Sequence, residues 1–438
     1  MQKWANRSSL AVIYLAIALF ASAATPHQIL EHIRLAAAEQ IAKSGNYSCL
    51  ETIERTYYRG FASRSGACEG ADISASTEIM HDRLKLNIAV SGGTEIFAWH
   101  SESKFSNQDI DKIVQGGPIS SGSFVGFLHN IFVEPGIEFT YRGTSREAGA
   151  QVDKFDYKVR KSVSSFRILG AANRSAIVPF HGSLTANAAT FELTSLKIVA
   201  DDIPLDLKIC ATDSELHYQL TDIAGTQTLI PRTYKMRIAD VTNIQTVSRS
   251  EYSRCHEFRA QSTLRFDDPG KLAETVSQSV AEQEIPAGVN LKIALLTTID
   301  EKTSFTGDPV DAILLAPAQN AQGETLLSRN TELHGIITEM QTFYVPETYH
   351  SLRIQFRSAS FEGKKYLLRA IHKASSKETK TITSLFGQLP APSDILEIEG
   401  GTFYIRSGHL HLNQKFKGEW ETVALPAANE TTRSHRNR

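Results

Sequence analysis

A long succession of strand-like segments constrains this chain more than any other feature of its sequence. Between residues 137 and 266, stretches such as KFDYKVRK and TFELTSLKIVAD are rich in β-branched and aromatic residues, and turn residues separate them at short intervals. Short strands spaced in this way are typical of a large antiparallel sheet or an open barrel. The chain is therefore expected to build this region around one curled sheet.

A helix and a hairpin precede this succession. Residues 27–43 place apolar side chains four positions apart, which predicts an amphipathic helix that needs a surface to cover. Residues 83–90 (RLKLNIAV) alternate apolar and polar side chains, the period of a half-buried strand. Gly92 and Gly93 then form a turn signal, and residues 94–99 (TEIFAW) are predicted to be the returning strand.

An apolar, helix-like segment interrupts the strands. Ser106 is expected to start a short helix that ends at Gly116 and Gly117, and residues 123–132 (SFVGFLHNIF) place four large apolar side chains on one helical face. Packing against the sheet explains this face, and an alternative is that it lines an apolar cavity. A helix, an apolar insert and a long meander together predict an α+β, mainly antiparallel β fold, a curled half-barrel sheet with helices over residues 26–267.

A second strand-rich region follows a polar stretch. Residues 268–284 are predicted to form a linker helix, and residues 285–424 to form a small β-barrel domain. Residues 425–438 are polar and are expected to be a disordered tail. The two β regions can share a sheet or stay separate, and the sequence leaves both open.

The first 23 residues have the order of a secretory signal. Lys3 and Arg7 precede an uncharged apolar run over residues 10–20, and Ala21 to Ala23 fit the small-residue cleavage pattern. We expect a signal peptide over residues 1–23, with an uncleaved anchor as the alternative. Since no later stretch is apolar enough to span a bilayer as a helix, the mature protein is expected to be periplasmic or secreted, and peripheral to the membrane at most.

Four cysteines fit this oxidising location. Cys49, Cys68, Cys210 and Cys255 form an even and sparse set, which in an exported chain indicates two disulfides. Three pairings are possible. Cys49–Cys68 with Cys210–Cys255 is favoured because each bond then closes a local loop, and buried free thiols are the alternative.

Few residues suggest chemistry. A net charge of −2 with scattered Lys and Arg argues against nucleic-acid binding. The chain has no G-x-S-x-G or H-E-x-x-H motif, and the pair Ser101 and Lys104 has the S-x-x-K spacing without its companion motifs. His409 and His411 lie two apart on a predicted strand and can face one metal ion, but no Asp, Glu or Cys near them in the sequence completes a ligand set. We therefore expect a non-enzymatic protein without a metal or cofactor.

The order of these elements resembles a known class of proteins. The signal, the helix of residues 27–43, the hairpin around Gly92 and Gly93 and the meander with FDYKV and FEL resemble the periplasmic lipoprotein carriers and sigma-factor regulators. That resemblance implies a half-barrel that holds apolar ligands against short helices. Residues 285–373, with an IPAG strand and a GD turn, resemble small envelope β-barrel modules, which implies an exported bacterial envelope protein.

Two functions follow as hypotheses, with an enzyme as a third hypothesis behind them. The first is a carrier that binds an apolar ligand, such as a lipoprotein acyl chain, in the half-barrel cavity. The second is an envelope scaffold that binds a protein partner through its β domains. For the carrier, the candidate cavity residues are Leu84, Leu86, Ile88, Phe97, Trp99, Phe124, Phe127, Leu128 and Phe132. A continuous apolar tunnel would favour the carrier, and a filled core the scaffold.

Overall fold

The structure is a computed structural model of the full chain. It describes residues 24–43, 46–60, 76–258 apart from 92, 103, 107, 115, 148, 172 and 173, then 283–373, and 401–425 apart from 407. The predicted signal peptide, Cys68, residues 268–282 of the predicted linker helix and residues 426–438 of the predicted tail lie outside these ranges.

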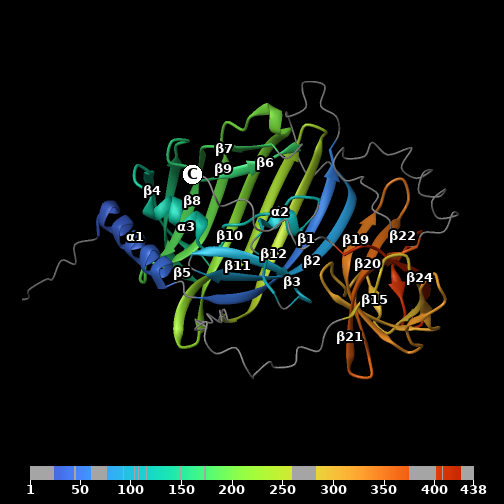
Figure 1. Ribbon diagram of the computed structural model, residues 1–438. Coiled ribbons are helices and arrows are strands. Elements are labelled where there is room, and N and C mark those ends of the chain that lie inside the picture. The colour runs from blue at the N-terminus through green and yellow to red at the C-terminus, as the bar shows by residue number, and fades with distance from the viewer. Residues whose placement is uncertain are drawn as a thin grey trace, which may run out of the picture.

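A curled antiparallel sheet dominates the N-terminal region (Figure 1). Within the described residues its strands follow the order β3-β2-β1-β12-β11-β10-β9-β8-β5-β4. The strands are β1 Tyr47–Arg59, β2 Thr77–Ser91, β3 Thr94–Trp99, β4 Glu138–Glu147, β5 Ala150–Val159, β8 Phe180–Asn187, β9 Leu193–Ala200, β10 Ile209–Ile223, β11 Thr226–Asp240 and β12 Ile244–Glu257. This sheet confirms the predicted half-barrel.

The alternation of side chains gives the sheet one apolar face and one polar face. On β2, Leu84, Leu86 and Ile88 are at most 3% exposed, and the polar residues between them face outward. Because successive side chains on a strand point to opposite faces, every second residue lies on the concave face. The predicted hairpin is present, with Ser91 opposite Thr94 across the turn.

Helices cover the concave face. The predicted N-terminal helix is α1 Pro26–Lys43, and it buries Ile29, Ile33 and Ala37 toward the sheet. The apolar insert forms α3 Gly126–Leu128 and the π-helix η2 His129–Val133, against which α1 packs. The short helix predicted from Ser106 is α2 Ile110–Ile113. The remaining elements of this region are β6 Arg167–Leu169, β7 Ser175–Ile177 and the 3-10 turn η4 Leu205–Leu207.

The C-terminal region closes into a barrel, as predicted. The strands β14, β16, β19, β20, β21 and β24 pair in that order, and β24 pairs with β14 to complete the circle. Trp420 fills the interior and is fully buried. The strands are β13 Gln283–Glu284, β14 Asn290–Leu295, β15 Ile299–Asp300, β16 Pro309–Leu314, β17 Ala318–Gln319, β18 Thr325–Leu327, β19 Glu332–Phe343, β20 Tyr349–Phe361, β21 Lys364–His372, β22 Thr402–Ile405, β23 His411–Leu412 and β24 Lys417–Thr422. The last two residues of the predicted linker helix thus form β13.

Hydrogen bonds join the two regions into one sheet. Residues 80–82 of β2 pair with residues 341–343 of β19. Beside them, residues 305–308 lie against β2, where the Lys85 backbone N–H donates to the Thr306 carbonyl at 2.8 Å. The Lys85 side chain also forms an ion pair with Asp308 at 2.7 Å. The sequence left open whether the two β regions share a sheet. In the structure they do, through the pairing of β2 with β19.

The favoured disulfide pairing is wrong. Cys49 on β1 is bonded to Cys255 on β12, across a sequence separation of 206 residues. Cys210 is disulfide-bonded as well. The prediction preferred local loops, but β1 and β12 are neighbours in the sheet. Strand pairing therefore brings these two cysteines together despite their distance in sequence.

In the described residues no helix is both long and apolar enough to cross a membrane.

Candidate functional site

The predicted cavity residues fall into two groups, one on the sheet and one on the segment that covers it. Leu84, Leu86, Ile88, Phe97 and Trp99 belong to the concave wall of β2 and β3, and none of them is more than 9% exposed. Phe124, Phe127, Leu128 and Phe132 belong to residues 116–133, which we call the insert. All nine residues join one hydrophobic cluster. The insert therefore fills the concave face in this structure.

A buried ion pair holds the start of the insert. Arg55 on β1 binds Asp82 on β2 through two hydrogen bonds, at 2.8 and 2.6 Å, and both side chains are 2% exposed. The same guanidinium donates to the carbonyl oxygen of Gly116 at 2.9 Å. Charge-assisted bonds of this kind are stronger than neutral ones, so Arg55 fixes the point at which the insert enters the half-barrel.

A carboxylate on β3 holds the middle of the insert. Glu95 accepts hydrogen bonds from the backbone N–H of Gly122 at 2.6 Å and of Phe124 at 2.9 Å, and from that of Val125. Burial of its carboxyl group raises the pKa of Glu95, while these three hydrogen bonds oppose the rise. Since Glu95 lies next to the hairpin turn, it ties the insert to the edge of the wall.

Three tyrosines reach the insert from the opposite strands. Tyr218 on β10 donates to the carbonyl oxygen of Ser123 at 3.1 Å, and Tyr252 on β12 hydrogen-bonds the Ser123 hydroxyl at 3.1 Å. Tyr234 on β11 donates to the hydroxyl of Ser120 at 2.9 Å. The insert is thus bound by side chains from five strands, β1, β3, β10, β11 and β12.

Glu51 is a second buried carboxyl group behind the insert. It lies on β1 directly opposite Tyr252, is 3% exposed, and is hydrogen-bonded to Ser250 and Tyr252. Burial is the main cause that raises the pKa of Glu51 to about 7. This side chain changes its charge near neutral pH in the interior of the protein.

The sequence analysis missed these polar residues, although it contained a signal for them. Glu51 and Arg55 have the same parity on β1 as the buried Ile53, and Asp82 has the same parity on β2 as Leu84. A charged residue at an inward position of an alternating strand must find a partner inside. The alternation along each strand identifies these charged residues as inward-facing, but it does not identify the segment to which they bind.

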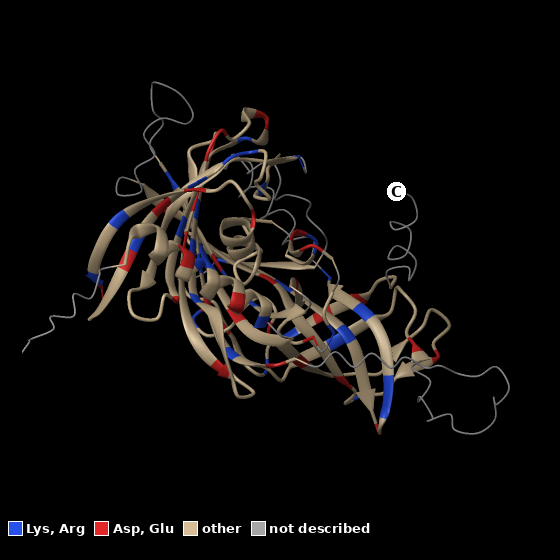
Figure 2. Ribbon diagram, turned by 90° about the vertical axis from the view of Figure 1, so that its left-hand side faces the viewer, with Lys and Arg blue, Asp and Glu red and all other residues tan. Residues whose placement is uncertain are grey.

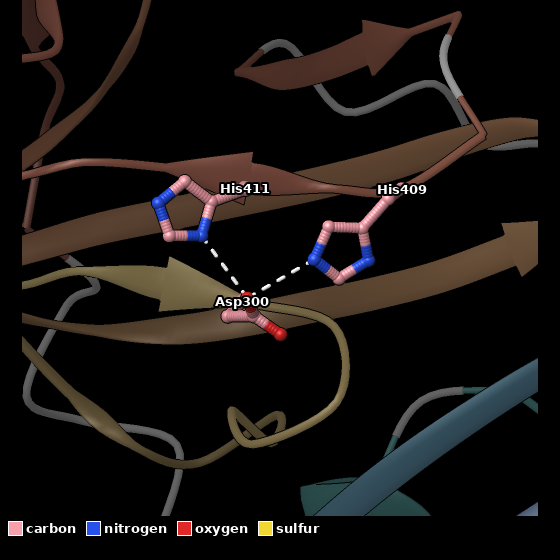
Figure 3. A group of neighbouring side chains, drawn as sticks. All are labelled: Asp300, His409 and His411. Atoms are coloured by element: carbon pink, nitrogen blue, oxygen red, sulfur yellow. Dashed lines mark hydrogen bonds and ion pairs between the residues drawn. The ribbon is translucent and has the colours of Figure 1, made fainter.

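A second cluster lies on the C-terminal barrel (Figure 3). Asp300 at the end of β15 contacts both His409 and His411. One oxygen of its carboxylate lies 3.1 Å from a ring nitrogen of His409 and 3.0 Å from a ring nitrogen of His411. Glu301 binds the other ring nitrogen of His409 at 2.8 Å. The sequence offered no carboxylate near the two histidines, but the fold supplies two from more than 100 positions earlier, at separations of 109 and 108.

Electrostatics in this cluster follow from its contacts. The hydrogen bond to His411, with the backbone N–H of Lys302, lowers the pKa of Asp300 to about 2. The hydrogen bonds to Glu301 and Asp300 raise the pKa of His409. The cluster therefore combines a carboxylate that stays ionised with an imidazole that holds its proton more tightly than usual.

The surface also has a polar cleft and a mixed distribution of charged residues. An open polar cleft of about 410 Å³ lies between the end of α1 and two loops, lined by Ala36, Glu39, Gln40, Lys43, Thr190, Glu192, Gly225, Thr226 and Gln227. Figure 2 shows basic and acidic residues interspersed over the described strands.

Comparison with known proteins finds similarity at the level of solved structures. No protein-family model matches the sequence, and no curated protein matches it. A LolA superfamily protein from Nitrosomonas europaea is 12% identical over 54% of this chain and 96% of its own length, with a TM-score of 0.26. A putative outer membrane lipoprotein-sorting protein domain from Vibrio parahaemolyticus is 10% identical over 54% of this chain and 94% of its own, with a TM-score of 0.25.

A third similar structure is a DUF1329 family protein from Desulfovibrio piger, 8% identical over 54% of this chain and 97% of its own, with a TM-score of 0.25. Each of the three alignments covers 54% of this chain.

Proposed function

We propose that this chain is an exported envelope protein that carries an apolar ligand, such as an acyl chain, on the concave face of its half-barrel. It acts by binding and performs no reaction. The observation that supports the proposal is the insert, a segment outside the sheet that covers an apolar wall and is attached to it by side chains. A ligand would bind where the insert lies.

The insert is attached to the sheet by contacts that can break and form again. The insert contains no strand that pairs with the sheet, and its backbone turns at Gly116, Gly117 and Gly122, each with a positive φ. Hydrogen bonds to single side chains can be replaced by water when a segment moves. The net contribution of each is about 0.5–1.5 kcal/mol between neutral groups and about 1.5–3 kcal/mol where a charged group such as Arg55 takes part. Movement of residues 116–133 would expose Leu86, Ile88 and Phe97 without breaking the sheet.

The energies of insert and ligand are of similar size. Four large apolar side chains of the insert, at roughly 1.5–3 kcal/mol each, supply about 6–12 kcal/mol of burial. An acyl chain with roughly ten buried methylenes supplies about 8 kcal/mol, at about 0.8 kcal/mol each. An acyl chain therefore supplies burial of the same size as the burial lost when the insert leaves the wall, and the hydrogen bonds of the insert favour the closed state when no ligand is bound.

A scaffold is the second candidate function. The concave face is filled by the insert and α1 in this structure, and a filled core is what a scaffold predicts. In that case the insert is a permanent part of the core, and its hydrogen bonds serve stability alone.

A variant that weakens the attachment of the insert distinguishes the carrier from the scaffold. Glu95→Gln replaces the carboxyl group that accepts three backbone N–H groups with an amide, which has a single acceptor oxygen, so the insert is held less tightly. For a carrier we expect Glu95→Gln to bind a fluorescent fatty acid more tightly than the native protein, by about tenfold if one charge-assisted bond of about 1.5 kcal/mol is lost. Glu138→Gln on the exposed part of β4 is the matched control, with native affinity expected.

Native mass spectrometry with lipid extraction supplies the second measurement. A carrier purified from the periplasm is expected to retain an apolar ligand in some preparations. If several preparations carry no lipid and neither the native protein nor Glu95→Gln binds the fatty acid, the carrier proposal is rejected and the scaffold remains.

A further inference from the structure

We infer that Asp300, His409 and His411 form a binding site for a divalent transition-metal ion such as Zn²⁺. The site lies on the C-terminal barrel and is independent of the proposed apolar ligand. It would have three protein ligands, a carboxylate oxygen and two imidazole nitrogens.

The distances between the three ligand atoms suit a small ion. Oδ2 of Asp300 lies 3.1 Å from Nε2 of His409 and 3.0 Å from Nδ1 of His411, and all three atoms lie within 4.8 Å of one another. In a tetrahedral zinc site with bonds of about 2.0 Å, ligand atoms are about 3.3 Å apart. The Asp300 oxygen therefore already lies at about the required separation from each imidazole nitrogen. The three side chains point toward one another in Figure 3.

The backbone fixes these side chains in advance. Asp300 and His411 are directly opposite each other in the β15–β23 ladder, and the Glu301 N–H donates to the Leu410 carbonyl at 3.2 Å. Ile299 in β15 and Leu410, just before β23, are fully buried, so Asp300 and His411 lie on the outward side of this ladder. His409 lies in a bend before β23, where its hydrogen bonds to Asp300 and Glu301 hold the ring.

A second carboxylate orients one of the ligands. Oε1 of Glu301 lies 2.8 Å from Nδ1 of His409, the nitrogen that faces away from Asp300. The other oxygen of Glu301 lies 3.1 Å from Nδ1 of the buried His350. Histidines that bind metals almost always donate their second nitrogen to a carboxylate, a carbonyl or water, which fixes the ring. Glu301 is therefore a positioning residue in this site.

The ligand set indicates the class of metal. Imidazole nitrogens suit zinc, copper, iron and nickel, whereas magnesium and calcium require oxygen ligands. Two histidines and one carboxylate leave the fourth position of a tetrahedral ion to water. Without a metal, the same contacts would be a hydrogen-bonded clamp between β15 and β23, and the experiment must separate these two cases.

Zinc competition with a chromophoric chelator makes the separation. The full-length protein, first stripped of metal, is expected to take up one Zn²⁺. His409→Ala and His411→Ala should each abolish this uptake, and Glu301→Gln should weaken it by about tenfold, as loss of an orienting partner does elsewhere. His334→Ala is the matched control, because His334 pairs with Asp311 at 2.8 Å in the same barrel and should leave the uptake unchanged.

A second measurement distinguishes loss of the zinc site from unfolding of the variant. Zn²⁺ should raise the melting temperature of the native protein, since it binds the folded state. Asp300→Asn keeps the size of the side chain and should remove this rise while the protein remains folded by circular dichroism. If the native protein takes up no zinc, or if the variants take up as much as the native protein, the cluster is a clamp and the inference is rejected.

Discussion

Charged side chains at inward positions are the most informative residues of this protein. Arg55 and Asp82 are both almost fully buried, and burial of charges is costly unless they pair and satisfy their hydrogen bonds. Here the pair also holds the Gly116 carbonyl. An apolar pair would fill the same space without that contact, so this buried pair is best explained by its hold on the insert.

Glu51 gives the first prediction, which concerns pH. Burial raises its pKa from the ordinary value of 4.5 to about 7, so between these values the folded state binds more protons than the unfolded state. The contribution of Glu51 to stability is therefore present below about pH 4.5 and is lost as pH rises to about 7. Glu51→Gln does not titrate, and should gain about 3 kcal/mol relative to the native protein across this range.

Urea unfolding of both proteins at several pH values measures this difference. Glu251→Gln on the solvent-facing side of β12 is the control and should keep the native pH profile. An unchanged difference between Glu51→Gln and the native protein from about pH 4.5 to about pH 7.5 would show that Glu51 is ionised throughout, and that its environment is wetter than the structure indicates.

The elements themselves were largely readable from sequence. The helix of α1, the β2–β3 hairpin and the strands of both regions follow from local periodicity, which a single sequence contains. The partner of each strand does not follow from that periodicity, because pairing depends on the whole sheet. The Cys49–Cys255 bond was therefore missed, and so was the contact of His409 and His411 with Asp300.

The disulfide gives a prediction at the level of β1 and β12. Cys49 and Cys255 tie the start of one strand to the end of its neighbour and close a very long loop. Because a crosslink restricts the unfolded chain, replacing both cysteines with serine should lower the free energy of unfolding by about 2–4 kcal/mol. Denaturant unfolding of the native protein and of the double variant, both without reductant, measures this loss, because reductant would also break the disulfide of Cys210.

Peptide mapping without reductant is the direct check on that bond. A crosslinked peptide that contains both Cys49 and Cys255 is expected. A crosslink between Cys49 and Cys68 would instead restore the pairing first favoured from the sequence.

At the scale of the whole molecule, the contact between the two regions depends on close backbone packing. Gly307 has a φ of +99° and lies against β2 and β3, where an added Cβ would be 2.4 Å from the Lys85 carbonyl oxygen and 2.8 Å from the Trp99 ring. Trp99 is one of the proposed wall residues. A change in the barrel region at this point would therefore reach the concave wall as well as the ladder between β2 and β19.

Gly307→Ala should therefore weaken the coupling between the two regions. The native protein is expected to unfold in one calorimetric transition, because the regions share a sheet, and Gly307→Ala should separate it into two. Gly323→Ala is the matched control, since Gly323 also has a positive φ, +83°, but no atom lies within 4 Å of its added Cβ.

Both variants carry the strain of a left-handed backbone, about 1–2 kcal/mol. Only Gly307→Ala adds overlap, which should cost about 1–3 kcal/mol more. Equal effects of the two substitutions would mean that the junction relaxes to admit the added methyl group, and would contradict the prediction.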